Sequence, residues 1–181
     1  MINKIFIGDA LQVLKDFPDN FVDMCITSPP YYGLRDYGIN GQLGQESDFN
    51  VYINKLLAIF DEVKRVLKKA GTCWVNISDT YKNKSLLGIP FQFAQGMLSK
   101  GWILRNTIIW HKPNAMPISV KDRFTIDFEY LFFFSKDKKY YFDQQLEPVK
   151  QSSIERITQK NFNQQRGFGV GGHIRHDNKD M

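Results

Sequence analysis

The chain has 181 residues, of which 43% are hydrophobic and 24% charged, and its formal net charge is +5. This length suits one globular domain with a substantial core, and the composition excludes a wholly disordered or fibrous protein. The excess of positive charge permits a polyanionic partner without identifying one.

No apolar run approaches the about 20 residues that a membrane span requires, and Asp9 interrupts the apolar start of the chain. We therefore expect a cytoplasmic protein with no membrane partner. Cys25 and Cys73 lie in separate apolar runs, without a CxxC pair or a histidine beside them. This arrangement predicts reduced core thiols and no metal site.

The first predicted elements alternate between strand and helix. Residues 4–7 form a short apolar run, and residues 10–17 carry apolar side chains at helical spacing, with Asp9 as the expected N-cap. Residues 21–27 are almost continuously apolar, which predicts a strand buried on both faces of a parallel sheet.

Two consecutive prolines, Pro29 and Pro30, follow this strand. Because they cannot continue a sheet ladder, the chain must leave the sheet and present the next side chains in a loop. The carboxyl ends of strands are where α/β folds place ligands. Residues 33–44 are rich in glycine and polar groups, so they are predicted to be a mobile loop.

Further strands and helices are predicted over the rest of the chain. Residues 68 and 69 are expected in the last turn of a helix that Gly71 stops. The predicted elements are a helix over 49–69, a strand over 72–77, a helix over 90–98, strands over 102–110 and 129–135, and a hairpin partner or edge strand over 140–142.

The alternation predicts an α/β fold with three layers, in which a mostly parallel sheet ends in an antiparallel edge hairpin. Residues 1–148 are expected to form the catalytic domain. Residues 149–181 are mainly polar and are expected to form a loosely ordered tail, as the possible start of a target-recognition region.

The string Thr27-Ser28-Pro29-Pro30-Tyr31-Tyr32 resembles motif IV of the DNA amino-methyltransferases, in which Asp, Asn or Ser precedes two prolines and an aromatic residue. Other segments resemble the same family in the same order. They are Gly8-Asp9, residues 76–79, residues 108–114, residues 120–124 and residues 129–136. Because the matches extend from residue 5 to residue 142, coincidence is a poor explanation for them.

The resemblance implies a Rossmann-like methyltransferase sheet and an S-adenosyl-L-methionine-dependent enzyme that methylates the amine of a base flipped out of double-stranded DNA, in a restriction-modification system. Ser before Pro-Pro is usual among cytosine-N4 enzymes, whereas Asp is usual among adenine-N6 enzymes. Cytosine N4 is therefore the preferred target, and adenine N6 remains an alternative.

Site residues follow from the motif positions. The Ser28 hydroxyl and the Pro29 carbonyl can accept hydrogen bonds from the amine, Pro30 helps to lock the loop, and Tyr31 can stack on the base. Tyr32 is a substitute for Tyr31. Asp9, Thr27 and Ser28 are expected near the methyl donor by resemblance.

A basic stretch offers candidate DNA contacts, although a solvated charged face explains it equally well. His111 and Lys112 have two equally good interpretations. They contact DNA or the methyl donor, or they are only the polar end of a strand. The expected DNA contacts are Tyr32, Arg35, His111, Lys112, Lys121 and Arg123.

The family's second signature, an FxGxG loop that holds the donor, is missing, so the sheet is expected to be incomplete. We expect the first half of an enzyme that needs a second polypeptide or a missing half, and a homodimer is compatible with this. A non-catalytic DNA-binding module is the alternative from another class. Protein-glutamine methyltransferases have a similar Pro-Pro-Tyr string, but their donor loop precedes it. Only 27 residues precede Ser28, which leaves too little room for that loop, so this alternative is rejected.

Two signals near the carboxyl end are rejected. Gly167, Gly169 and Gly172 satisfy GxGxxG, but no buried strand precedes them and no apolar helix follows. His173 and His176 lack the carboxylate or thiolate company of a metal site.

Overall fold

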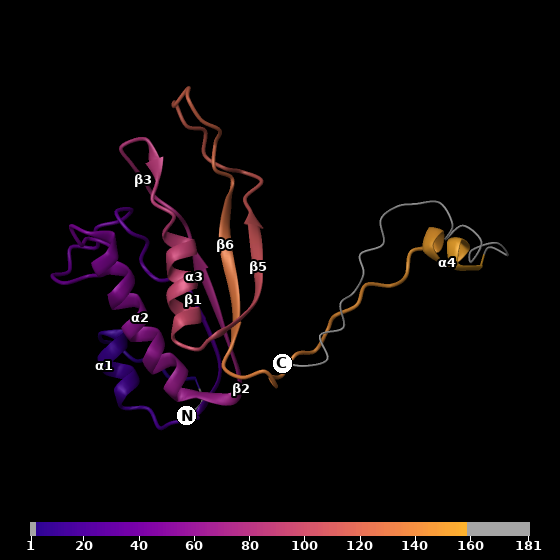
Figure 1. The fold of residues 1–181 in the computed structure, drawn as a ribbon, viewed down its shortest axis with the longest axis horizontal. Helices are drawn as coiled ribbons and strands as arrows, with labels where there is room; N and C mark the ends of the chain where they lie inside the picture. The colour runs from indigo at the N-terminus through magenta and orange to yellow at the C-terminus, as the bar shows by residue number, and fades with distance from the viewer. Residues whose placement is uncertain (1–2, 159–181) are drawn as a thin grey trace. The chain divides into compact units, whose positions relative to one another are not determined.

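A computed structural model describes residues 3–158. One unit extends to Phe142 and a second begins at Asp143. The first unit contains α1 (Ala10–Lys15), β1 (Val22–Thr27), α2 (Phe49–Val66), β2 (Leu67–Ile77), β3 (Tyr81–Lys82), β4 (Ser85–Leu86), α3 (Ile89–Ser99), β5 (Ile103–His111) and β6 (Phe128–Ser135) (Figure 1).

The main sheet has the order β1-β2-β6-β5. β1 pairs with β2 in parallel, whereas β6 is antiparallel to both of its neighbours, β2 and β5. The predicted α/β fold is confirmed, and three of the four strands run in the same direction. The antiparallel pair at the edge of the sheet is formed by β5 and β6, and not by residues 129–135 with residues 140–142 as expected.

Residues 140–142 form no strand, contrary to the prediction. Tyr140 and Phe142 instead place their rings 5.6 and 6.0 Å from that of Phe133, between centroids. Phe133 also stacks on Trp74 at 4.0 Å. The aromatic pattern that resembled a strand therefore marks a cluster of rings against the sheet.

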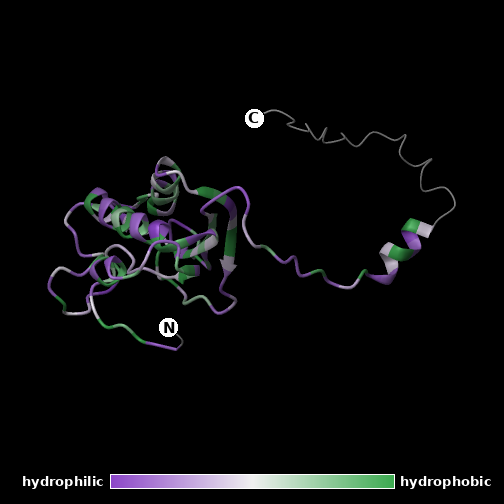
Figure 2. Cartoon of the chain, turned by 90° about the horizontal axis from the view of Figure 1, so that it is seen from below, coloured by the Kyte–Doolittle hydropathy of each residue, from purple (hydrophilic) through white to green (hydrophobic). Residues whose placement is uncertain are grey.

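The core lies between the sheet and the helices α2 and α3. α2 is amphipathic, because its apolar side chains recur at helical spacing and most of them are buried. Figure 2 shows that the helices of this unit carry both hydrophobic and hydrophilic residues. Along β2, Cys73, Val75 and Ile77 are fully buried, while Trp74 and Asn76 between them are not. Because side chains alternate along a strand, Cys73, Val75 and Ile77 face the helices, and Trp74 and Asn76 face the opposite side of the sheet.

No helix of residues 3–142 covers that opposite side at β1. Ile26, the register partner of Trp74, is 70% exposed, and Met24 is exposed as well. Within residues 3–158, therefore, β1 is an edge strand with one partner and one exposed face, and it is not buried on both faces as predicted. Within the described residues the helices pack on one face of the sheet, and β1 presents the exposed Met24 and Ile26 on the other face, as expected of an incomplete sheet.

The predicted strand over residues 4–7 is also absent. Ile7 is 97% exposed, and within residues 3–158 the only strand that pairs with β1 is β2. A segment forms a strand only when a neighbour satisfies its backbone groups, and the described residues provide none beside residues 4–7.

Leu67 continues directly from α2 into β2, so Lys68 and Lys69 lie in the strand and not in the last helical turn as predicted. Val22 pairs with Leu67 here, and the Phe21 amide donates to the Val66 carbonyl at 2.7 Å. Pairing with β1 thus overrides the helical propensity of the two lysines.

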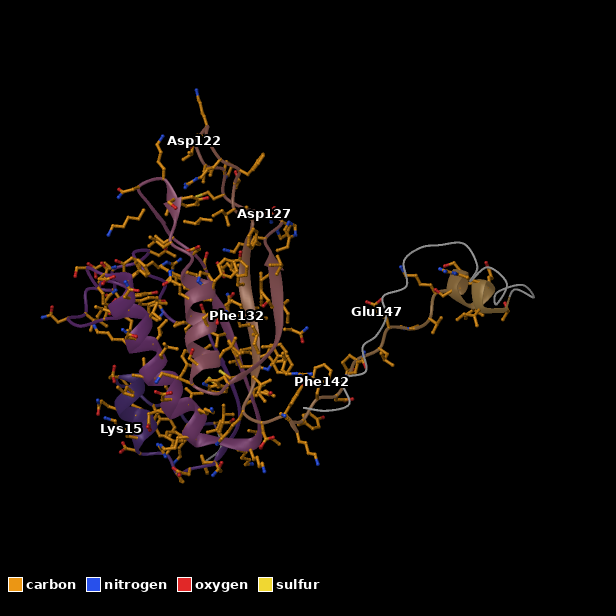
Figure 3. The ribbon with its side chains drawn as sticks, viewed as in Figure 1. Lys15, Asp122, Asp127, Phe132, Phe142 and Glu147 are labelled. Atoms are coloured by element: carbon orange, nitrogen blue, oxygen red, sulfur yellow. The ribbon has the colours of Figure 1, made fainter. Side chains whose placement is uncertain are left out.

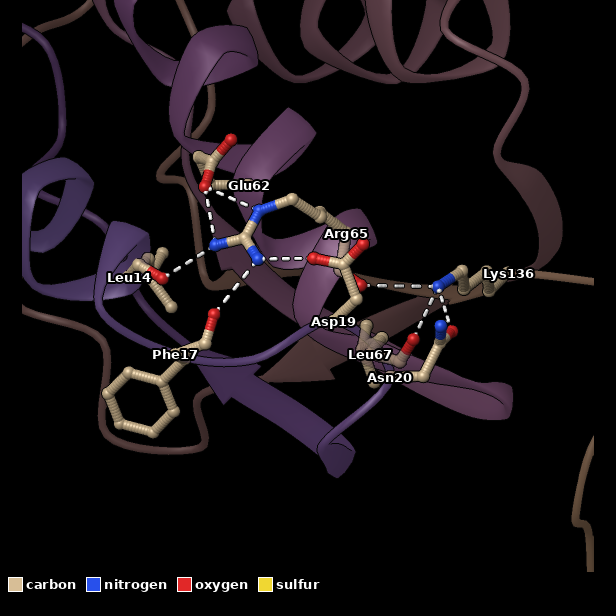
Figure 4. Close-up of polar contacts among 8 residues, drawn as sticks. All are labelled: Leu14, Phe17, Asp19, Asn20, Glu62, Arg65, Leu67 and Lys136. Carbon is tan, nitrogen blue, oxygen red and sulfur yellow. Dashed lines mark hydrogen bonds and ion pairs between the residues drawn. The ribbon is translucent and has the colours of Figure 1, made fainter.

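Arg65 ties the end of α1 to the end of α2 (Figure 4). Its guanidinium donates to the carbonyls of Leu14 and Phe17, each at 2.9 Å, and pairs with Asp19 and Glu62. Through this network Arg65 supplies side-chain donors to two carbonyls at the carboxyl end of α1, of which that of Leu14 also accepts from the Phe17 amide at 3.0 Å.

We expect Arg65→Met to lower the melting temperature by several degrees, because the Phe17 carbonyl loses its donor, the Leu14 carbonyl loses one of its donors, and two ion pairs are broken. The control is Lys68→Met, which removes only the exposed pair with Asp23 and should change the temperature little. Thermal unfolding followed by circular dichroism makes the comparison. Equal shifts for the two variants would mean that the carbonyl bonds contribute nothing.

Further along the chain, α3 begins with Pro90 in its first turn and ends before Gly101, whose φ is +76°, as the sequence predicts. The second unit contains α4 (Gln151–Thr158), which the sequence did not predict. Among residues 3–158, no helix is both long and apolar enough to cross a membrane. The GxGxxG string and the two histidines after it lie outside the described residues.

Candidate active site

Four polar side chains meet at one edge of the sheet. Ser28 follows β1, Asn76 lies near the end of β2, and Lys112 follows β5. Glu129 lies near the start of β6, which reaches the same edge because β6 runs in the opposite direction. They line one cavity of about 360 Å³ together with Pro29, Pro30, Tyr31, Leu34, Arg35 and Tyr37.

A chain of hydrogen bonds runs from Ser28 to Glu129. The Ser28 hydroxyl donates to the Tyr31 hydroxyl at 3.3 Å, and the Tyr31 hydroxyl donates to Glu129 Oε2 at 2.8 Å. Asn76 Nδ2 donates to the same oxygen at 2.7 Å, and Lys112 Nζ pairs with Glu129 Oε1. The carboxylate of Glu129 is thus the acceptor on which the site is organised.

The network also sets the charges of the site. Burial would raise the pKa of Glu129, but hydrogen bonds from Lys112, Tyr31 and Asn76 outweigh it and hold the pKa below its ordinary value. Burial raises the pKa of Tyr31 to about 12, and the bond to Glu129 adds to the rise against the opposing bond from Ser28. At neutral pH the site therefore holds a carboxylate and a neutral phenol.

Tyr52 fixes the proline corner, residues 28–30, from beneath. Its hydroxyl donates to the Pro30 carbonyl at 2.8 Å, and its side chain is fully buried on α2. Burial raises the pKa of Tyr52, so it remains a donor. The Pro30 carbonyl is thereby occupied, and the Ser28 oxygen and the Pro29 carbonyl are the acceptors that the corner offers to a ligand.

Residues 33–44 form a loop whose ends are held together, since the Gly33 amide donates to the Gly44 carbonyl at 2.7 Å. Gly44 has φ of +93°, and a Cβ there would lie 2.7 Å from the Tyr31 carbonyl oxygen. Glycine is required at this position by both its conformation and its close approach. The loop contributes Leu34, Arg35 and Tyr37 to the wall of the site.

A second cavity, of about 430 Å³, meets the first at the proline corner. It is lined mainly by apolar side chains of α1, α2 and Phe6, and it shares Ser28, Pro29 and Pro30 with the polar cavity. Thr27 and Cys25 also line it. Two hollows of different chemistry therefore adjoin the same three residues.

The structure brings together most of the residues expected at the motif, with one exception. Tyr32 is buried in the core, 5.6 Å from Tyr52 between ring centroids, and does not line the polar cavity. Its predicted contact with DNA does not fit this position, because the Tyr32 ring packs against Phe49 and Tyr52 of α2. Asp9 caps α1 by accepting from the Gln12 amide at 3.1 Å, and its neighbours Gly8 and Ala10 line the apolar cavity.

The basic residues are divided between two places. Arg35 and Lys112 line the polar cavity, and the exposed His111 lies 3.6 Å from Asp127. Lys121 and Arg123 lie in the connection between β5 and β6, where the Arg123 guanidinium lies 3.5 Å from the centre of the Tyr81 ring.

Asn76 and Glu129 are site residues that the sequence reasoning did not select. A signal was present, because each is a polar residue within or beside an otherwise apolar strand. Asn76 Oδ1 is buried and has no hydrogen-bond partner among the described residues. Such a group in a strand is costly unless it has a role.

Comparison with known proteins finds a matching family model and several similar proteins. A family model described as DNA methylase matches residues 22–174. The type II methyltransferase M.Cfr9I of Citrobacter freundii is 45% identical over 168 residues, which cover 77% of this chain and 56% of the relative. This chain therefore spans about half the length of that relative.

Two solved structures share the fold. The PvuII DNA methyltransferase, described as cytosine-N4-specific, has a TM-score of 0.63 at 20% identity, over 84% of this chain and 61% of that chain. The M1.HpyAVI complex with SAM has a TM-score of 0.53 at 20% identity, over 79% and 57%. At this identity the likeness establishes the Rossmann-like methyltransferase fold and nothing finer.

Proposed function

This chain belongs to the DNA methylase family whose model it matches, and on that premise we propose that it forms the base-binding half of an S-adenosyl-L-methionine-dependent DNA methyltransferase. The proposed substrate is the exocyclic amine of a base extruded from double-stranded DNA. Cytosine N4 is the preferred target because Ser28, and not Asp, precedes the two prolines.

One observation supports this function above the others. A polar cavity and an apolar cavity adjoin at residues 28–30. Transfer of a group between two molecules requires both to meet at one point, with the reacting atoms aligned and water excluded. The corner is such a point, with the base on the polar side and the donor approaching from the side of the apolar cavity.

The direction of the hydrogen bonds suits an amine. Ser28 directs its proton to Tyr31, whose own proton goes to the Glu129 carboxylate. The Ser28 oxygen is therefore left with free lone pairs, and it can accept one N–H of the amine while the Pro29 carbonyl accepts the other. Holding both N–H groups in this way weakens the conjugation of the nitrogen lone pair with the ring.

The described residues fit only part of the methyl donor. The apolar cavity offers Thr27 and Ser28 at the corner, and Asp9 adjoins two of its lining residues. None of the described residues that line it is a lysine or an arginine, so it offers no cationic side chain for the methionine portion of the donor. The donor supplies the electrophilic methyl group, and we propose that a further polypeptide segment completes its site.

The isolated chain is accordingly expected to bind S-adenosyl-L-methionine weakly, with a dissociation constant above about 0.1 mM, because few polar partners are present. Isothermal titration of the chain with the donor measures this constant. Micromolar binding by the chain alone would overturn the incomplete donor site.

Ser28→Ala is expected to lower the rate of methyl transfer roughly 100-fold, since one group that positions the amine is lost. The assay is single-turnover transfer by the chain completed with the remaining half of a methyltransferase, and DNA affinity should change little. Ser99→Ala, a hydroxyl at the end of α3, serves as the control. An unchanged rate in Ser28→Ala would refute the proposed role.

Nucleoside mass spectrometry of the methylated DNA distinguishes the targets. N4-methylcytosine is the expected product. Detection of N6-methyladenine would instead show that the base bound in this way is adenine. A chain that binds duplex DNA but yields no methylated nucleoside, even when completed, would instead be a non-catalytic binding module.

A further inference from the structure

Two segments that project beyond the main sheet form one lobe. The first is the hairpin of β3 and β4, residues 81–86, and the second is the arm between β5 and β6, residues 112–127. They are joined by the Arg123 guanidinium on the Tyr81 ring, at the base of the hairpin, and by an ion pair of 3.0 Å between Asp122 and Lys84, at its tip. Figure 3 places Asp122 at the tip of the arm.

The lobe is continuous with the candidate active site. The Lys112 amide donates to the Asp127 carbonyl at 2.6 Å and closes the base of the arm. Lys112 itself and Glu129, which lies two residues beyond the arm, line the polar cavity. A partner bound to the lobe would therefore lie next to a ligand in the polar cavity.

The surface of the lobe is both cationic and apolar. Lys84 is neutralised by Asp122, but Lys82 and Lys121 are exposed and form no ion pair within residues 3–158. Phe124 is 95% exposed, and Met116 is exposed on the same arm. Large apolar side chains exposed on a projecting segment contribute nothing to the core, so they indicate a contact with a partner.

We propose that the lobe docks on duplex DNA beside the extruded base, with Lys82 and Lys121 on backbone phosphates and Phe124 as a wedge in the base stack. This inference rests on the proposed function, since the cavity must take its base from that duplex. Unpaired lysines favour a polyanion over a protein partner. An extruded base leaves a gap in the stack, and an inserted aromatic ring offsets part of the cost of opening it.

The wedge is tested with Phe124→Ala and a matched control, Tyr141→Ala. Tyr141 is 76% exposed and is next to Phe142, which Figure 3 places at the other end of the sheet from the arm. Fluorescence anisotropy with a duplex of about 20 base pairs and no donor should show about tenfold weaker binding for Phe124→Ala, with an unchanged salt dependence. Tyr141→Ala should bind as the wild type does.

The phosphate contacts are tested with the double variant Lys82→Ser, Lys121→Ser. Its plot of log affinity against log salt should be shallower than that of the wild type by about 1.8, since each phosphate contact contributes about 0.9. The control is Lys138→Ser, Lys139→Ser, which removes the same charge from an exposed turn after β6. Circular dichroism checks that each variant is folded.

The outcomes separate this inference from the proposed function. If the wild type binds duplex DNA and the lobe variants behave as their controls do, the lobe is not the docking surface, while the transfer assay with Ser28→Ala still stands. If the wild type binds no duplex at any salt concentration, the lobe proposal falls and DNA as the partner falls with it.

Discussion

Replacing Glu129 by leucine should lower the free energy of unfolding by about 2 kcal/mol, because three donors lose one acceptor. The Glu129 side chain is only 14% exposed, and Lys112, Tyr31 and Asn76 all bond to it. The full cost of breaking a buried ion pair is not expected, since Lys112 reaches solvent. Chemical denaturation of the chain measures the change.

A matched control for the lost carboxylate is Asp23→Leu, which breaks only an exposed pair with Lys68. It should cost less than about 1 kcal/mol. A loss in Glu129→Leu no greater than that of the control would mean that the network does not hold the site together.

The same network predicts two effects of pH. Glu129 has a lowered pKa in the folded chain, so its contribution to stability is present above its unfolded pKa and is lost as the pH falls through the folded value. Glu129→Gln should remove that acid-side dependence. It should also lower the pKa of Tyr31 from about 12, because the carboxylate helps to raise it. Absorbance of the phenolate during an alkaline titration reports the second effect.

Gly44→Ala is expected to cost about 3 kcal/mol of stability and to displace the loop over the active site. Its φ of +93° is unfavourable for alanine, and the new methyl group would lie 2.7 Å from the backbone oxygen of Tyr31. A backbone atom cannot move aside as a side chain can, so Tyr31 and the proline corner must shift.

Gly41→Ala separates the cost of the backbone conformation from the cost of the contact with Tyr31. Gly41 has a similar φ of +78°, but no described atom lies within 4 Å of the position that its new methyl group would take. It should cost only about 1 kcal/mol, from the backbone conformation alone. Denaturation of both variants gives the difference. Equal losses would show that the contact with Tyr31 carries no energy.

Local patterns predicted most of the elements correctly. The apolar spacing of α2 and α3, the N-cap at Asp9 and the end of β1 at the two prolines depend on neighbours in the sequence, and all are confirmed. Wrong predictions depended on a partner elsewhere in the chain. Residues 4–7 lack a strand to pair with, and residues 140–142 pack as rings against Phe133.

The candidate site shows the same division. The motif itself identified residues 28–31, because two consecutive prolines end the strand and start a loop whatever the strand's neighbours in the sheet are. Glu129, 98 positions beyond Tyr31, could not be selected from spacing, since only the opposite direction of β6 brings it to the same edge of the sheet. Likewise, the motif favoured Tyr31 over Tyr32 as the residue that stacks on the base, but only the packing shows that Tyr31 lines the cavity and that Tyr32 lies in the core.

The sequence by itself therefore determined the α/β fold, the order of the elements and the proline corner, because helix periodicity and locked proline dihedrals are local properties. Tertiary structure alone decided which strand runs in the opposite direction, which polar groups share the Glu129 carboxylate and where two cavities adjoin. Those features arise from contacts between residues far apart in the chain, whose free energy no local pattern contains.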